Sequence, residues 1–131
     1  MGQTMSGRSR ASAKQAGARQ ERLIADYLAA HVDDRIDRRV KTGGKDKGDI
    51  AGLRVHGQRV VVEVKNTARI DLAGWAREAE QERINDEALA GLVMHKRHGE
   101  GAAGKQWVTC TLDDLISLIT GHRPTTEGKN Q

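Results

Sequence analysis

Two neighbouring stretches decide the fold of this 131-residue chain: GDIAGL at residues 48–53 and RVVVEVK at residues 59–65. Both are rich in aliphatic residues, and the short segment 56–58 between them is typical of a turn, so together they predict a β-hairpin. Side chains alternate between the two faces of a strand. The valines at alternate positions of the second strand therefore face a core, and Glu63 and Lys65 share the opposite face.

A charged pair on a strand that is otherwise valine indicates a site. Burying Glu63 without a partner would cost several kcal/mol, which a metal ion or the neighbouring Lys65 would offset. Asp49 stands at the head of the adjacent hairpin strand and completes a set of two carboxylates and a lysine. Such a set can hold Mg²⁺ and position a water against a phosphodiester. Asp46, in the glycine- and lysine-rich loop 42–48, is a competing ligand, but Asp49 is favoured because an apolar strand continues from it.

The remaining elements follow from periodicity and capping signals. Asp71 and Thr111 are good helix N-caps, and Gly121 ends the last helix. The resulting order is helix, three strands, helix, two strands, helix, which predicts an α/β fold with a central mixed sheet flanked by helices. The expected helices span residues 14–31, 72–86 and 112–120, and the expected strands span 35–42, 49–55, 59–65, 90–96 and 106–110.

The length predicts one domain over residues 14–122, between disordered tails at 1–13 and 123–131. Because the chain has no Phe and only 2% aromatic residues, its core must be aliphatic, supplemented by Tyr27, Trp75 and Trp107.

The bulk composition narrows the class of protein. A net charge of +4 and a pI near 9.5 fit a polyanionic partner. The single cysteine, Cys110, excludes an internal disulfide and a cysteine-rich zinc site, and favours a reducing compartment. No apolar run has the length of a membrane span, and the basic N-terminus lacks the apolar core of a signal peptide. We therefore expect a cytoplasmic protein without a membrane partner.

Several other charged residues are candidates for the metal site or for DNA contacts, and each of them has two interpretations. Glu21 falls on the apolar stripe of the first helix, so it is either an ion-pair residue held by Arg22 or Arg39, or a carboxylate aimed at the site. The basic N-terminal tail is either solvated or a DNA-contacting arm. The cluster His95, Lys96, Arg97 and His98 is either a phosphate contact or a solvated loop flank.

The pattern as a whole resembles the PD-(D/E)xK nuclease superfamily, with its restriction-endonuclease-like core. Its elements are a glutamate on the first helix, Gly48-Asp49, a hairpin, Glu63-Val64-Lys65, a helix and a strand. Within that superfamily the chain is most similar to small Holliday-junction resolvases of the archaeal type and their phage relatives. The resemblance covers roughly residues 14–110, and one departure is that Gly48 stands where the motif has proline.

The resemblance implies a role for each matched residue. Asp49 and Glu63 would ligate Mg²⁺ or Mn²⁺, together with the carbonyl of Val64, and Glu21 would bind the metal directly or through water. Lys65 would orient or activate the attacking water. The DNA contacts expected beside this site are Lys45, Lys47, Lys96, Arg97 and His98.

The expected function is that of a metal-dependent endodeoxyribonuclease acting on branched DNA, with roles in recombination and repair. Symmetric cutting of a four-way junction implies a homodimer. Two alternatives remain open: a nuclease of the same fold acting on ends, flaps or restriction-like sites, and a non-catalytic DNA-binding module. A pure binder gains nothing from carboxylates that face phosphates, which favours an enzyme.

Overall fold

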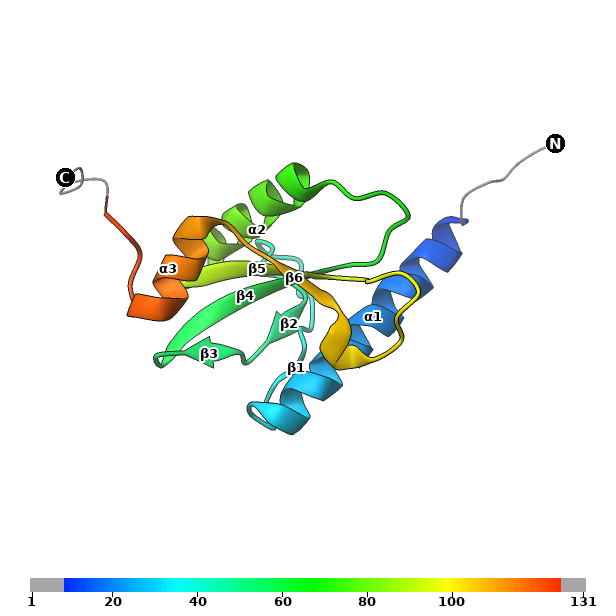
Figure 1. Ribbon diagram of the computed structural model, residues 1–131, viewed down its shortest axis with the longest axis horizontal. Coiled ribbons are helices and arrows are strands. Elements are labelled where there is room, and N and C mark those ends of the chain that lie inside the picture. The colour runs from blue at the N-terminus through cyan, green and yellow to red at the C-terminus, as the bar shows by residue number, and fades with distance from the viewer. Residues whose placement is uncertain (1–8, 126–131) are drawn as a thin grey trace.

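The computed structural model describes residues 9–125, so residues 1–8 and 126–131 lie outside this account. The chain forms an open mixed sheet flanked by helices, as predicted (Figure 1). Among the residues described, none of the helices combines the length and the apolar character needed to cross a bilayer. The elements in chain order are α1 (Arg10–His31), β1 (Asp37–Arg38), β2 (Ile50–Ala51), β3 (Arg54–Val55), β4 (Gln58–Lys65), α2 (Leu72–Asp86), β5 (Ala90–His95), the 3₁₀ turn η1 (Ala103–Lys105), β6 (Trp107–Thr109) and α3 (Leu112–Thr120).

The sheet is built around the parallel pair β4 and β5. Its order is β1-β2-β4-β5-β6, with β3 also pairing with β4. Val60 pairs with Ala90 at one end of the parallel ladder, and Lys65 pairs with His95 at the other. All other strand pairs are antiparallel. Parallel neighbours need a crossover connection, and α2 supplies it, so the helix lies directly over the strand that carries Glu63 and Lys65.

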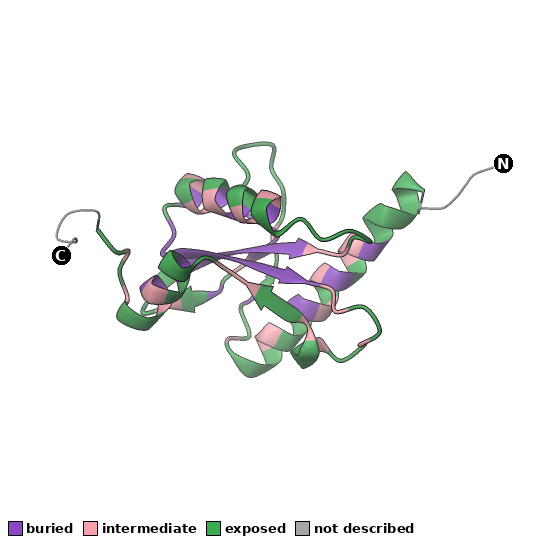
Figure 2. Cartoon of the chain, turned by 45° about the horizontal axis from the view of Figure 1, so that its top comes forward, coloured by how far each residue is buried: buried purple, intermediate pink, exposed green. Residues whose placement is uncertain are grey.

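The two faces of β4 have the predicted difference in chemistry. Its alternate valines at 60, 62 and 64 belong to the main aliphatic core, together with Ile24 and Ala25 of α1. The opposite face is covered by α2, where Trp75 and Ala79 pack with Val93 of β5. Figure 2 shows β4 and β5 as the most continuously buried part of the sheet. Glu63 therefore lies in a covered layer between sheet and helix.

The hairpin has a bulge that the sequence did not reveal. The expected strand 49–55 is divided into β2 and β3, and the pairing with β4 shifts by one residue between them. Gly52, at the break, has φ +97°, and a Cβ there would lie 3.0 Å from the carbonyl oxygen of Arg35. The extra residue bends the strand, as bulges do. The following turn places His56 and Gly57 at positive φ, the geometry of a tight two-residue hairpin.

Two expected boundaries were wrong by several residues. The first strand was predicted over 35–42 but comprises only β1, because the chain leaves the sheet into a loop after residue 38. The first helix begins at Arg10 because the Ser9 hydroxyl caps it by accepting from the backbone N–H of Ser12. Ser9 and residues 10–13, all expected in the disordered tail, are therefore the cap and first turn of the helix, whereas residues 1–8 of that expected tail lie outside the described residues.

The bounds of α2 and α3 agree with the sequence prediction. The side chain of Asp71 caps α2 by accepting from Gly74 N–H, and Thr111 forms a capping box with Asp114 at the start of α3. Gly121 ends α3 in a left-handed conformation. Arg123, assigned from sequence to the C-terminal tail, donates to the Asp114 carboxylate at 2.6 Å.

The prediction for the aromatic residues was right for one of three. Trp75, on α2, is buried against the sheet, but Tyr27 and Trp107 are 43% and 47% exposed. Trp107 lies on β6, at the edge of the sheet, and the guanidinium of Arg97 stacks over its ring with 4.5 Å to the centroid. Because β6 is an edge strand, one of its sides has no neighbouring strand. The ring of Trp107 is therefore covered by the Arg97 guanidinium and not by core side chains.

Candidate metal centre

Glu63 and Lys65 lie side by side near the end of β4, under α2. Lys65 Nζ lies 3.2 Å from Glu63 Oε2 and 2.8 Å from Glu78 Oε1 of α2. Glu63 is only 6% exposed, and its other oxygen, Oε1, is buried with no hydrogen-bond partner among the described residues. Glu63 Oε2 is therefore neutralised by Lys65, and Glu63 Oε1 can bind a ligand.

Asp49 is fixed against the same strand from the neighbouring side. Its Oδ2 accepts the backbone N–H of Val64 at 2.8 Å, and its Oδ1 accepts from Lys41 Nζ at 2.9 Å. Its own N–H donates to the carbonyl of Val62. The sequence did not identify Lys41, which acts here as the counter-ion of the predicted metal ligand.

The backbone explains why glycine precedes this aspartate. Gly48 has φ +97°, and a Cβ at this position would lie 2.9 Å from the carbonyl oxygen of Val62. Proline is restricted to φ near −65°, so it cannot adopt this conformation. The glycine allows the loop to approach β4 closely enough for Asp49 to bond to the strand.

A third buried carboxylate, Glu82 of α2, was missed in the sequence analysis. Glu82 is 2% exposed, and one oxygen each from Glu82, Glu63 and Asp46 lie within 4.8 Å of one another. Asp46, which the sequence ranked below Asp49, thus belongs to this group. A signal was present, because Glu82 lies seven residues after Trp75 and three after Ala79, on the helical stripe that faces the sheet.

Burial dominates the electrostatics of the two glutamates. It raises the pKa of Glu63 from 4.5 to about 7. A hydrogen bond with the Glu82 carboxyl and the charge of Lys65 oppose this shift, and the charge of Asp49 adds to it. Burial also raises the pKa of Glu82 to about 10, followed by the effect of Glu63. Two adjacent buried carboxyls resist simultaneous ionisation, so the pair retains at least one proton near neutral pH in the metal-free protein.

These shifts predict an unusual pH dependence of stability. A carboxyl group whose pKa is higher in the folded state than in the unfolded state binds more protons in the folded state, so the free energy of unfolding decreases as pH rises between the two values. For Glu63 this decrease extends from pH 4.5 to about 7, and for Glu82 it extends toward pH 10. The slope is up to about 1.4 kcal/mol per pH unit for each extra proton held. Glu82→Gln should flatten this decline.

The measurement is urea unfolding of wild type and variant in EDTA at pH 5 and pH 8. The free energy of unfolding of wild type, relative to the variant, should drop between these values. Parallel pH profiles for the two proteins would contradict a protonated carboxyl pair.

Glu21 is held apart from this cluster. Its Oε1 accepts from Arg38 Nε of β1 at 3.0 Å, so its pairing partner is neither of the two arginines named from the sequence. It is not among the three clustered carboxylates found in the described residues. Its role as a metal ligand stays a prediction.

The expected DNA-contacting residues fall in two groups. Lys45 and Lys47 are exposed on the loop that also carries Asp46, and residues 39–47 enclose a hollow of about 540 Å³. Lys96 follows β5, and its N–H donates to the carbonyl of Lys65, which brings the second group to the end of the site. In this group the side chains make local contacts: Lys96 to Glu100, Arg97 to Trp107 and His98 to Thr67, whereas His95 is buried.

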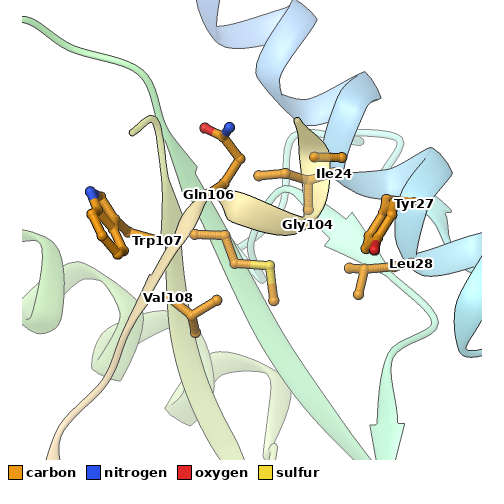
Figure 3. Close-up of a pocket in the computed structure, with 9 residues that line it drawn as sticks. Ile24, Tyr27, Leu28, Gly104, Gln106, Trp107 and Val108 are labelled. Atoms are coloured by element: carbon orange, nitrogen blue, oxygen red, sulfur yellow. The ribbon is translucent and has the colours of Figure 1, made fainter. Parts of the chain in front are cut away.

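A separate pocket of about 170 Å³ opens between α1, η1 and β6 (Figure 3). Its walls are apolar, with Ile24, Leu28 and Met94 among them, and no carboxylate or cationic side chain lines it. Ile24 and Met94 belong to the core face of the sheet, opposite Glu63. The pocket is therefore distinct from the acidic cluster and lacks its chemistry.

The chain was compared with protein-family models, curated proteins and solved structures. No match was found in any of them. The site's own geometry is thus the basis for an assignment of function.

Proposed function

We propose that this chain is a Mg²⁺- or Mn²⁺-dependent endodeoxyribonuclease that hydrolyses phosphodiester bonds in branched DNA. The observation that carries the proposal is Glu63 on β4, whose Oε1 is buried with no donor group among the described residues and whose Oε2 lies 3.2 Å from Lys65 Nζ, beside Asp49, which accepts the N–H of Val64 on the same strand. Asp49 immediately precedes β2, Glu63 and Lys65 lie on the paired strand β4, and α2 packs over this strand. The element order supports a restriction-endonuclease-like core.

The residues fit a hard divalent cation. All available donors are carboxylate and carbonyl oxygens, which Mg²⁺ and Mn²⁺ prefer. Glu63 Oε1 needs a cation or a proton, since its buried position excludes solvent. Asp49, Glu63 and the carbonyl of Val64 would hold the ion, which when bound would lower the pKa of a coordinated water and offset charge on the phosphate.

The lysines supply the remaining chemistry. Lys65 Nζ, already 3.2 Å from Glu63, can orient an attacking water by a hydrogen bond and stabilise charge on the phosphorane. Lys45 and Lys47 are exposed on the loop beside the acids, where they can bind the backbone on either side of the cut phosphate. A net charge of +4 favours the approach of DNA despite the local acids.

A substrate panel tests the function directly. Purified protein is incubated with a four-way junction, a flap, linear duplex and single-stranded DNA, each with Mg²⁺, Mn²⁺ or EDTA. We expect preferential binding to the junction, paired nicks close to the branch point, and no cutting in EDTA. Sedimentation at the same concentration should show the homodimer that paired nicks require.

The other outcomes distinguish the alternatives. Equal cutting of junction and duplex, or a monomer, would favour a general nuclease of this fold. Binding without cleavage under every metal condition would favour a non-catalytic DNA-binding module. Cleavage undiminished by EDTA would refute the metal-dependent mechanism.

A further inference from the structure

Glu82 is a buried acid that has no cationic partner among the described residues. Glu82 is only 2% exposed, and no N–H or hydroxyl among the described residues donates to either of its carboxylate oxygens. Its one close polar neighbour is the carboxyl of Glu63, with which it can share a proton but which brings no positive charge. A buried carboxylate in this state is unfavourable unless a proton or a cation neutralises it. Its position on the covered face of α2 therefore calls for a ligand.

The two nearby lysines are committed to other carboxylates. Lys65 contacts Glu63 Oε2 and Glu78, whereas Lys41 contacts Asp49 and lies 3.9 Å from Asp46. None of the ion pairs formed by the described residues includes Glu82. Among the described residues, lysines thus neutralise Asp46, Asp49 and Glu63, but no cationic side chain neutralises Glu82.

The spacing of the oxygens suits a single ion. Oxygen ligands lie about 2.0–2.6 Å from Mg²⁺ or Ca²⁺, so ligands on opposite sides of an ion are roughly 4–5 Å apart. One oxygen each from Asp46, Glu63 and Glu82 falls within 4.8 Å of the others. The loop that carries Asp46 is tied to α2 where Asn85 Nδ2 donates to the Asp46 carbonyl at 2.7 Å, which holds Asp46 beside Glu82.

We propose that Glu82 is a metal ligand, which forms with Asp46 and Glu63 a three-carboxylate site for a divalent cation of the Mg²⁺ and Mn²⁺ class. The inference rests on the proposed function and adds a ligand from the helix that the acid–acid–lysine pattern does not include. Glu63 belongs to both sets of acids, with Asp49 on one side and Glu82 on the other. Its position makes it the shared ligand of the whole centre.

The test is Mn²⁺ binding by the DNA-free protein, followed by the electron paramagnetic resonance signal of free Mn²⁺. Wild type should bind Mn²⁺, and Glu82→Gln should weaken binding at least about tenfold, since loss of even an outer-shell partner costs 10- to 100-fold. Glu87→Gln, which removes the same charge from an exposed position at the end of the same helix, should bind as wild type does.

Melting temperature separates a ligand from a structural residue. In EDTA, Glu82→Gln should melt no lower than wild type, because it removes a buried ionisable group, while Mn²⁺ should raise the melting temperature of wild type more than that of the variant. A variant that melts lower in EDTA with an unchanged response to Mn²⁺ would assign Glu82 a structural role. If Glu82→Gln does not fold, Asp46→Asn provides the same binding test on the exposed loop.

The outcomes also separate this inference from the nuclease proposal. Wild-type Mn²⁺ affinity in Glu82→Gln, or in Asp46→Asn, would overturn the three-carboxylate site while metal-dependent cleavage could stand. Failure of wild type to bind Mn²⁺ at millimolar concentration would also overturn it. The nuclease proposal itself falls only if the DNA panel shows no metal-dependent cutting.

Discussion

Glu63→Gln and Asp49→Asn are each expected to abolish DNA cleavage and to leave DNA binding intact or tighter. Glu63 contacts Lys65 and belongs to the group of clustered carboxylates, and Asp49 is fixed to the backbone of the same strand at Val64. Metal catalysis contributes several kcal/mol of charge stabilisation, and each 1.4 kcal/mol is tenfold in rate. The loss should therefore be at least about a hundredfold. Binding should survive because each change removes a negative charge near phosphate.

The measurement is single-turnover cleavage of a four-way junction with Mg²⁺, beside a binding assay in Ca²⁺ or EDTA. Asp113→Asn is the matched control, since Asp113 is exposed on α3 and loses the same charge. Circular dichroism must show the wild-type fold in each variant. Wild-type rates in either Glu63→Gln or Asp49→Asn would remove the basis for the proposed mechanism.

Lys65→Ala should have the second largest effect, a loss of roughly a hundred- to a thousandfold in cleavage, as for removal of one preorganised charge-stabilising group. Both nicks in a junction should disappear while junction binding persists. The physical reason is that Lys65 Nζ is the ammonium in contact with Glu63, at 3.2 Å, and lies within the covered layer. Its charge therefore acts where water screens it little.

The same cleavage assay, with binding measured in parallel, checks this expectation. Lys105→Ala serves as control, because Lys105 is an exposed lysine of η1 and its loss changes the net charge equally. If Lys65→Ala loses binding in proportion to cleavage, Lys65 is a phosphate anchor. If it cuts at the wild-type rate, its role at the reacting phosphate is refuted.

The sequence predicted those features that depend on neighbouring residues along the chain. The helix caps at Asp71 and Thr111 depend on residues three positions apart, and the alternation of side chains around Glu63 depends on residues two positions apart. Both patterns are visible in the sequence, and both agree with the structure. The mixed sheet flanked by helices followed from the order of these elements. Local rules were therefore enough for the fold class and for the strand that carries the candidate site.

The features that the sequence did not reveal depend on contacts between distant segments. Glu82 meets Glu63 only because α2 crosses back over β4 with one particular stripe turned toward the sheet. Lys41 reaches Asp49 across an irregular loop that has no periodicity to read. Trp107 was expected in the core because aromatic residues are scarce, but its strand is the edge of the sheet. Helical spacing could place Glu82 on the stripe that faces the sheet, but which residue it meets there, like the other two outcomes, is set by how the elements pack.

The ion pair between Lys41 and Asp49 has a consequence for how the protein matures. Many small metalloproteins fold only when the ion binds, because the free energy of metal binding is needed to stabilise the fold. Here an amine from the chain itself neutralises Asp49 at 2.9 Å. If a cation binds here as proposed, folding can therefore finish first and loading can follow as a separate, reversible step, in which the cation would take the place of Lys41 at Asp49 and free the charge of Lys41 for the proposed DNA substrate.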